Sequence, residues 1–454
     1  MMNKYLDILK EKSFWGNIGT IFLLECLLGI IVKIKYGNLD AYIGLLLPML
    51  AVVIVIFWYG TYKKADYIFL VICVVLQMMG IMMQCIIQKS KAGFALKEQI
   101  LLMVALVGAI AFMILYSKVL MKLSEDLKFK LLIAITVVTY IVLLIFGKDT
   151  GGAKAWLLIG GFSIQPTEFI KLFAIFFFTL TFCNDEWEDK EKIKYGVGFL
   201  IINGICSVLI GEMGSFLIML TVFMVYVILF LSSLKYAVIF VGAGVGVGGI
   251  GFGIGKLCTL YATKKNITGG VIAKLANKFD LIMNRFNGLF HPEKVYQTFA
   301  ARQGMALGGL LGNGMKSTVD IPVSESDYIF PEIIMNIGLL CGVLIVILFA
   351  VLFIFGVRMY LKQTDYRNMG LIVGSLFYIT VQSFLMFFGS TGFFIMTGVP
   401  ISFISDGGTA MMVTFIMIGL IINANDNEYP VSGNREKKVV WKDENGTEYV
   451  DSEL

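Results

Sequence analysis

Histidine is almost absent from this chain, which has one, His291, in 454 residues. A single histidine excludes a Ser-His-Asp triad built around any other histidine, and it excludes a histidine-rich metal site. The seven cysteines stand singly, mostly within apolar runs, and no CxxC spacing occurs. The sequence therefore predicts neither a zinc site nor a disulfide framework.

Charge is also scarce, because 15% of the residues are charged and 58% are hydrophobic, whereas a soluble domain has about 25% charged residues. The net charge of +5 comes mostly from lysines in the connections. No basic patch interleaved with aromatic residues is present, so the sequence does not indicate nucleic-acid binding. Long apolar runs separated by short polar connections are typical of a polytopic membrane protein.

Hydropathy predicts an all-α, polytopic transmembrane helical bundle of about twelve spans. The first apolar run is followed by many others, so we interpret it as a retained helix and not as a cleaved signal peptide. The predicted spans cover residues 14–34, 41–60, 66–88, 98–117, 129–147, 167–183, 194–210, 212–232, 236–256, 328–357, 368–389 and 405–424.

The distribution of lysine and arginine between the connections predicts the orientation. Most of these residues fall on the side that also holds both termini, so we expect both termini in the cytoplasm. Lys89, Lys91 and Lys97 argue against this locally. The orientation makes residues 257–327 a large outer loop before the tenth span, and the polar segment 425–454 a cytoplasmic tail.

The run "VGAGVGVGGIGFGIG" (241–255) superficially resembles a dinucleotide-binding fingerprint. It lies inside an apolar span and lacks a preceding strand and a downstream acidic partner. Close helix packing or local flexibility is the better interpretation.

The stretch "GGAKAWLLIGGFSIQPTEFIKLF" (151–173) combines charge with a helix start. Pro166 suits the first turn of a helix, which places Glu168 and Lys171 three residues apart on one face. This spacing fits an ion pair that only neutralises two charges. It equally fits an active cavity, since ionisable groups within a bilayer are costly.

Three further acids are isolated near or within apolar runs. Glu212, in "LIGEMGSF", is either an interfacial loop residue or a buried polar anchor, and Glu25 is expected to make a helix–helix contact. Asp327, in "SESDYIF", precedes the tenth span, where an Asp can cap a helix. A partly desolvated carboxylate there can also act as a general base.

The large loop contains "VYQTFAARQGMALGGLLGNGM" (295–315). Its glycine cluster is either a flexible turn or a phosphate cradle built from backbone N–H groups. Arg285 and Arg302 are candidates for contact with an anionic ligand or with lipid headgroups.

Four blocks in order resemble the SEDS family of shape, elongation, division and sporulation proteins, which includes FtsW, RodA and SpoVE. These blocks are "GGAKAWLLIGGFSIQPTEFIKL", "YQTFAARQGMALGGLLGNGM", "IPVSESDYIFPEIIMNIGLL" and "TGVPISFISDGGTA". The resemblance covers about residues 150–424. Because the family usually has ten spans, it implies a core at 66–424 and an extra N-terminal transmembrane hairpin at 1–65.

The resemblance implies a peptidoglycan glycosyltransferase in the bacterial cytoplasmic membrane. It would polymerise lipid II on the outer face with inversion, in cell division, elongation or sporulation. Asp327 takes the position of the catalytic base, and Glu168 and Lys171 match the family's acidic and basic residues. A lipid-linked precursor flippase, or a silent scaffold for a class B penicillin-binding protein, is the alternative.

Substrate contacts follow from the same blocks. Positive charge for the leaving diphosphate could come from Lys171, from Arg302 or from a divalent cation, Mg²⁺ or Mn²⁺. The expected partners are lipid II, membrane lipid and a class B penicillin-binding protein transpeptidase, with no nucleic acid. The candidate substrate-binding residues are Arg302, Gln303, Arg285, Gln165 and Glu212.

The chain also departs from the family pattern. Ala155 replaces the arginine before the tryptophan of the first block, Met335 and Asn336 replace paired glutamates, and Asp406 replaces a tyrosine. These changes spare Glu168, Lys171 and Asp327. The expectation is therefore an active but divergent enzyme.

Overall fold

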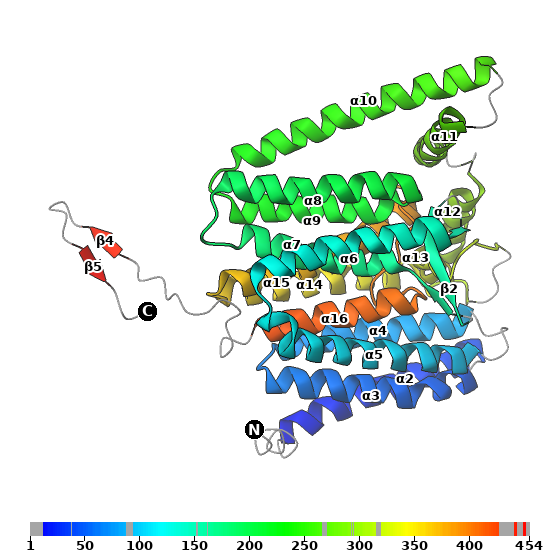
Figure 1. Cartoon of the computed structure of the whole chain (residues 1–454). Helices are drawn as coiled ribbons and strands as arrows, with labels where there is room; N and C mark the ends of the chain where they lie inside the picture. The colour runs from blue at the N-terminus through cyan, green and yellow to red at the C-terminus, as the bar shows by residue number, and fades with distance from the viewer. Residues whose placement is uncertain are drawn as a thin grey trace.

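The structure, a computed structural model, is a bundle of long helices that run side by side (Figure 1). The helix α2 begins, and the helix α16 ends, at one end of the bundle, which we call the terminal end. The opposite end carries the strand β2 and the helices α12 and α13, and we call it the loop end. The described residues are 12–37, 39–87, 94–150, 153–160, 162–265, 270–291, 293, 295–314, 319–425, 440–442 and 448–450.

The first half of the bundle matches the predicted spans closely. Its helices are α2 (Lys12–Tyr36), α3 (Leu39–Tyr62), α4 (Tyr67–Ile87), α5 (Phe94–Lys118), α6 (Glu125–Phe146), α7 (Pro166–Phe182), α8 (Asp189–Ile210) and α9 (Met213–Phe230). The second half comprises α10 (Lys235–Lys265), α11 (Gly270–Phe290), α12 (Tyr296–Gly308), α13 (Ile329–Asn336), α14 (Leu339–Lys362), α15 (Tyr366–Thr391) and α16 (Gly408–Ala424).

Local sequence explains several of the helix ends. The Ser124 side chain accepts a hydrogen bond from the Leu127 N–H at the start of α6, and Asp365 accepts one from the Asn368 N–H at the start of α15. Pro166 occupies the first turn of α7, where its missing N–H is not needed. The helix α8 stops at Gly211, which has a left-handed φ of 85°.

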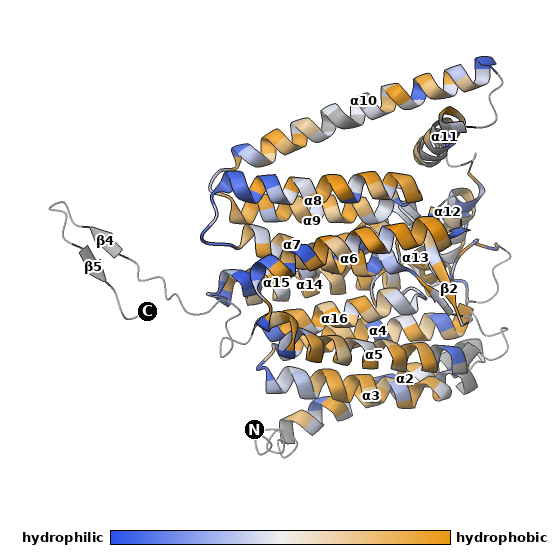
Figure 2. Ribbon diagram, in the orientation of Figure 1, coloured by the Kyte–Doolittle hydropathy of each residue, from blue (hydrophilic) through white to orange (hydrophobic). Residues whose placement is uncertain are grey.

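The apolar surface of the bundle is that of a multi-pass membrane protein. Within the described residues, eight helices are long and apolar enough to cross a bilayer. Hydrophilic residues collect toward the two ends, whereas the middle of the helices is apolar (Figure 2). Many large apolar side chains, such as Leu47 and Ile145, are exposed on the outside, which is the expected surface toward lipid tails.

The order of packing places α15 in the interior. It contacts α7, α9, α14 and α16, while α5 packs along α16 and α3. The hairpin of α2 and α3 lies against α4 and α5 (Figure 1). Buried Glu25 of α2 accepts a hydrogen bond from the Tyr42 hydroxyl of α3 at its backbone oxygen, 2.8 Å away. This contact between α2 and α3 uses the Glu25 backbone, so the role expected for its side chain stays a prediction.

The predicted span at 328–357 is wrong, because the structure divides it into α13 and α14. Gly338 separates the two helices with a φ of 116°, a conformation that side chains with a Cβ rarely adopt. A Cβ there would also lie 2.3 Å from the Leu310 carbonyl oxygen. The chain therefore turns where hydropathy alone indicates a continuous helix.

A small antiparallel sheet, absent from the sequence prediction, precedes α7. It consists of β1 (Lys148–Thr150), β2 (Ala153–Ile159) and β3 (Phe162–Ile164), in the order β1-β2-β3. Within the polar tail, the structure describes the paired strands β4 (Val440–Lys442) and β5 (Glu448–Val450). The rest of the predicted tail lies outside the described residues.

The glycine-rich helix α10 stands apart from the bundle (Figure 1). It is longer than predicted and packs mainly against α11 and α9. A Cβ at Gly244 or Gly251 would meet nothing within 4 Å, and Gly255, against Phe279, is an exception. Close packing against the bundle is therefore wrong for most of this run, because the helix has few neighbours to pack against.

Candidate functional site

The candidate site is organised around the α15–α16 loop, residues 392–407, at the loop end. Gly398 of this loop has a left-handed φ of 67°. A Cβ at Gly398 would lie 3.5 Å from the Oδ2 atom of Asp327. Glycine at this position therefore lets the backbone turn directly beneath the candidate base.

Asp327 is half-buried, at the end of a segment that the loop holds by backbone contacts. The Ser405 hydroxyl donates to the Ser326 carbonyl oxygen at 3.0 Å, and the Asp406 N–H donates to the Glu325 carbonyl oxygen at 3.0 Å. Tyr328, and not Asp327, occupies the N-cap position of α13.

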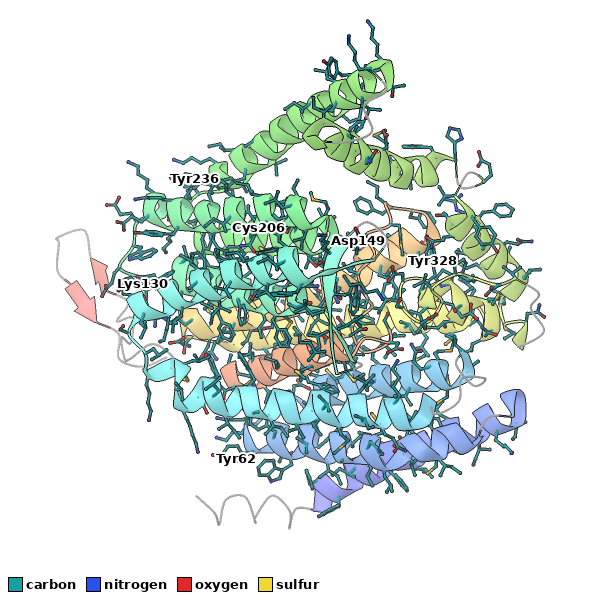
Figure 3. The ribbon with its side chains drawn as sticks, turned by 45° about the vertical axis from the view of Figure 1, so that its right-hand side comes forward. Tyr62, Lys130, Asp149, Cys206, Tyr236 and Tyr328 are labelled. Carbon is teal, nitrogen blue, oxygen red and sulfur yellow. The ribbon has the colours of Figure 1, made fainter. Side chains whose placement is uncertain are left out.

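The neighbouring residue Tyr328 packs toward α12. Its side chain lies beside that helix (Figure 3), and its hydroxyl shares a 3.4 Å hydrogen bond with the Thr298 hydroxyl. Asp327 therefore stands where the large loop, α13 and the α15–α16 loop meet.

Glu168 and Lys171 form a buried ion pair, with Nζ and Oε1 2.7 Å apart and both side chains 1% exposed. The Tyr378 hydroxyl donates to the second Glu168 oxygen at 2.6 Å. The Lys171 ammonium also donates to Gln382 Oε1 at 3.0 Å, and Gln382 Nε2 donates to the Pro400 carbonyl oxygen at 2.8 Å. The pair is therefore connected through Gln382 to the α15–α16 loop.

Glu212 is half-buried at the N-cap position of α9 and is the centre of a second polar cluster. Its Oε1 atom accepts hydrogen bonds from Gln165 Nε2 and from the Thr167 hydroxyl, both at 3.1 Å, and from the Ser215 hydroxyl. Its other oxygen is buried without a hydrogen-bond partner. Burial raises the pKa of this carboxyl group, and the hydrogen bond from Ser215, the Lys171 charge and the hydrogen bond from Thr167 oppose the shift.

The α15–α16 loop touches this second group as well. A Cβ at Gly214 would lie 2.5 Å from the Thr397 carbonyl oxygen. Thr409, just after the loop, accepts a hydrogen bond from the Gln165 N–H at 3.2 Å. The loop thus joins Asp327, the Glu168–Lys171 pair and the Glu212 cluster, which are far apart in sequence.

The three candidate substrate-binding residues of the large loop differ in their burial and in the helix that carries them. Arg302 of α12 is half-buried and donates to the Gly392 carbonyl oxygen at 3.0 Å. Gln303 is exposed beside it. Arg285 lies on α11, and its side chain is outside the described part of the chain. The structure therefore brings Arg302 to the α15–α16 loop.

The glycine cluster 308–314 packs against the α13–α14 junction. The Gly312 N–H donates to the Gly308 carbonyl oxygen at 2.8 Å, and the Asn313 N–H donates to that of Met335 at 2.9 Å. Since both N–H groups are already paired, the structure favours the turn over a phosphate cradle.

The four residues that depart from the family pattern are either buried or paired with a neighbouring side chain. Asp406 lies 3.5 Å from the Lys97 ammonium, which gives a local partner to one of the lysines that the orientation did not explain. The Asn336 amide donates to Glu332 Oε1 at 2.8 Å, and Met335 is buried. Ala155 is buried on β2.

Three residues of the site lie outside the four matched blocks and have no signal in the sequence. Gln382 and Tyr378 lie within the apolar α15, and their partners are more than 200 positions earlier in the chain. Ser405 belongs to a matched block, but Gln84 of α4 lies outside every block. A spacing pattern cannot reveal contacts of this kind, because they arise only when the bundle closes.

The structure does not support the expected binding of a divalent cation by protein side chains. Among the described residues, no three His, Cys, Asp or Glu side chains come together to hold a metal ion.

Together, the fold and the site define a multi-pass helical membrane protein with a buried charged network beneath one end. The family model described as "Cell cycle protein", for FtsW, RodA and SpoVE, matches residues 64–429. The chain belongs to this family. The hairpin of α2 and α3 precedes the matched part.

Named relatives support the same family. A probable peptidoglycan glycosyltransferase FtsW of Enterococcus hirae is 26% identical over 307 residues, which are 66% of this chain and 74% of the relative. The stage V sporulation protein E of Bacillus subtilis is 25% identical over 311 residues, 65% of this chain and 78% of the relative.

Solved structures share the fold. A chain from a study of the "structural coordination of polymerization and crosslinking by a peptidoglycan synthase complex" matches with a TM-score of 0.55 at 17% identity. The match covers 80% of this chain and 98% of that one. The rod shape determining protein RodA of Thermus thermophilus matches with a TM-score of 0.50 at 14% identity, covering 80% of this chain and 97% of that one.

Proposed function

We propose that this chain is a peptidoglycan glycosyltransferase that polymerises lipid II, with Asp327 as the general base. The relatives bear the name of this activity. The observation that carries the assignment is the half-buried carboxylate of Asp327 beside Gly398 of the α15–α16 loop. The same loop is connected through Gln382 to the buried Glu168–Lys171 pair.

The reaction is a displacement at a sugar carbon. The Asp327 carboxylate accepts the proton of the C4 hydroxyl of the acceptor's N-acetylglucosamine, and that oxygen attacks the anomeric carbon of the donor. The bond to undecaprenyl diphosphate breaks with inversion. A base positioned in this way contributes about 10²–10⁴-fold in rate.

The other charged residues act on the leaving group and on the loop. Arg302, half-buried at Gly392, supplies positive charge to the leaving diphosphate. Lys171 is 1% exposed and already holds Glu168 and Gln382. Lys171 and Glu168 are therefore positioning residues, which fix the α15–α16 loop through Pro400. Gln165 and Glu212 support the same loop, and Gln303 and Arg285 are left as candidates for substrate contact.

The orientation follows from the lysines and arginines at the terminal end. Lys118, Lys128 and Lys362 lie at helix ends there, and by the positive-inside rule these cations support a terminal end on the cytoplasmic side. The loop end, with Asp327, then faces outward, and both termini are inside. The partner is a class B penicillin-binding protein, as the synthase complex of the matching structure suggests.

The decisive experiment uses the purified full chain and lipid II, alone and with its cognate transpeptidase, with glycan products resolved on gels. Glycan strands from the wild type and none from Asp327→Asn support the proposal. A flippase would move lipid II across vesicle membranes without making strands, and a scaffold would stimulate the partner while Asp327→Asn remained equally effective. Either result would overturn the assignment.

A further inference from the structure

The side chain of Gln84, on α4, donates hydrogen bonds to the segment that carries Asp327 and to the α15–α16 loop. The Gln84 Nε2 atom donates to the Glu325 carbonyl oxygen at 2.8 Å and to the Ile404 carbonyl oxygen at 3.3 Å. The Gln84 side chain is 4% exposed. One buried amide therefore joins Glu325, two residues before Asp327, to Ile404 of the α15–α16 loop.

Two groups of the α15–α16 loop also donate hydrogen bonds to the segment before Asp327. The Asp406 N–H donates to the same Glu325 oxygen, and the Ser405 hydroxyl donates to the next carbonyl oxygen, that of Ser326. The Ser405 oxygen is itself fixed, because it accepts a 2.8 Å hydrogen bond from the Ile401 N–H. Both carbonyl groups before Asp327 are thus held in place.

The Asp406 side chain extends the connection to α5. Its carboxylate lies 3.5 Å from the Lys97 ammonium, with Asp406 16% and Lys97 56% exposed. A pair this exposed contributes little stability by itself. Its geometric effect is to hold the Ser405–Asp406 dipeptide against the N-terminal part of α5.

We propose that Gln84 is a positioning residue, which orients Asp327 toward the acceptor hydroxyl by fixing the Glu325 and Ile404 carbonyl groups. This inference rests on the proposed function, because it assigns to Gln84 the orientation of the base. A general base works only within hydrogen-bond reach of the proton it accepts. A displacement of about 1 Å, caused by a change away from the reacting atoms, can cost about 10²-fold in rate.

The chain offers a matched control in Gln77. It lies seven residues earlier on α4, two helical turns away on the same face, and is 3% exposed. It lines the same small pocket as Gln84 and Ser405, but within the described part of the chain its Oε1 atom has no hydrogen-bond partner. Gln77→Leu therefore removes a buried amide from this pocket without removing a bond to the loop.

The experiment compares Gln84→Leu, Gln77→Leu and Asp327→Asn in lipid II polymerisation by the full chain. For Gln84→Leu we expect kcat to fall about 10–100-fold, with KM within about twofold of the wild type. Gln77→Leu should stay within about twofold in both. Hydrogen exchange at the Asp406 and Tyr328 amides should be faster in Gln84→Leu only.

A pH profile of Gln84→Glu adds a readout that a merely structural role would not change. A carboxyl group can donate a hydrogen bond only while it is protonated. The rate of this variant relative to the wild type should therefore rise as the pH falls. A flat ratio would contradict the requirement for a donor at this position.

The outcomes separate the two proposals. If Gln84→Leu polymerises as fast as Gln77→Leu while Asp327→Asn is inactive, the positioning role is overturned and the proposed function stands. If Asp327→Asn keeps the wild-type rate, the proposed function falls, and the role of Gln84 falls with it. A loss in Gln84→Leu that appears equally in Gln77→Leu would also overturn the positioning role.

Discussion

At the scale of single residues, the contact between Asp327 and the loop around Gly398 makes a charge-neutral substitution informative. Asp327→Asn keeps the size of the side chain but cannot accept a proton near neutral pH. We expect the protein to fold and insert normally, and the polymerisation rate to fall by about 10²–10⁴-fold. Product gels measure the rate, and near wild-type activity would remove Asp327 from the reaction.

Lys171→Met tests whether the buried ammonium positions the loop. The substitution removes the hydrogen bond to Gln382 and leaves Glu168 as an uncompensated buried charge, which is strongly destabilising by about 3–5 kcal/mol. Activity should be lost. Exchanging the two residues should restore part of the stability but not the activity, because the ammonium would no longer reach Gln382. Full recovery of activity would indicate a simple ion pair.

Glu332 predicts a pH dependence at the loop end. Burial raises the pKa of this carboxyl group to about 7, opposed by the hydrogen bond from Asn336, while Asp320 and Glu325 raise it further. The folded state thus binds the proton more tightly than the unfolded state. The stability of the wild type should fall as the pH rises from about 4.5 to about 7.

Glu332→Gln removes this titration and retains an acceptor for Asn336. We expect the variant to melt at a higher temperature than the wild type at about pH 8 and at nearly the same temperature at about pH 4.5. Thermal unfolding in detergent at the two pH values measures the difference. An equal gain at both values would show that Glu332 does not titrate in this range.

The sequence singled out the charged candidate residues of the site but not the hydrogen bonds that connect them. Asp327, Glu168 and Lys171 stood out because charge is rare in a chain so apolar. The roles of Gln84 and Gln382 depend on partners brought close only by the packing of α4, α7 and α15. Uncharged polar residues are also common in membrane helices, so the sequence alone does not distinguish these two glutamines from others.

At the scale of elements, the junction between α13 and α14 depends on Gly338. Gly338→Ala adds a Cβ at a positive φ and within 2.3 Å of a backbone oxygen. We expect a loss of stability of more than about 1 kcal/mol, measured by thermal unfolding. Gly244→Ala is the control, since Gly244 lies within the helix α10 and a Cβ there would meet no atom of the described residues within 4 Å.

Hydropathy predicted most helices at this scale because a bilayer demands a minimum apolar length. It missed the break at Gly338, since a glycine in an apolar run leaves the mean hydropathy almost unchanged. It also missed β1–β3, whose apolar and polar residues resemble an ordinary connection. The conformation of one backbone residue, and the pairing of short strands, are not encoded in average polarity.

At the scale of the whole molecule, the orientation in the membrane is open to a direct test. In a cysteine-free background, Ser324→Cys at the loop end should react with a membrane-impermeant thiol reagent added to intact cells. Asp126→Cys, at the terminal end with the native Asp126 side chain 76% exposed, should react only after permeabilisation. The reverse pattern would invert the proposed topology.

The contacts between α4 or α5 and the α15–α16 loop also have a consequence for biosynthesis. Gln84 and Lys97 are translated well before their partners Ile404 and Asp406, and Gln84 and Ile404 are 320 positions apart in the chain. These contacts can therefore form only after the intervening helices have been synthesised. A chain that terminates before the α15–α16 loop therefore cannot form these contacts around Asp327, and it would lack the proposed activity.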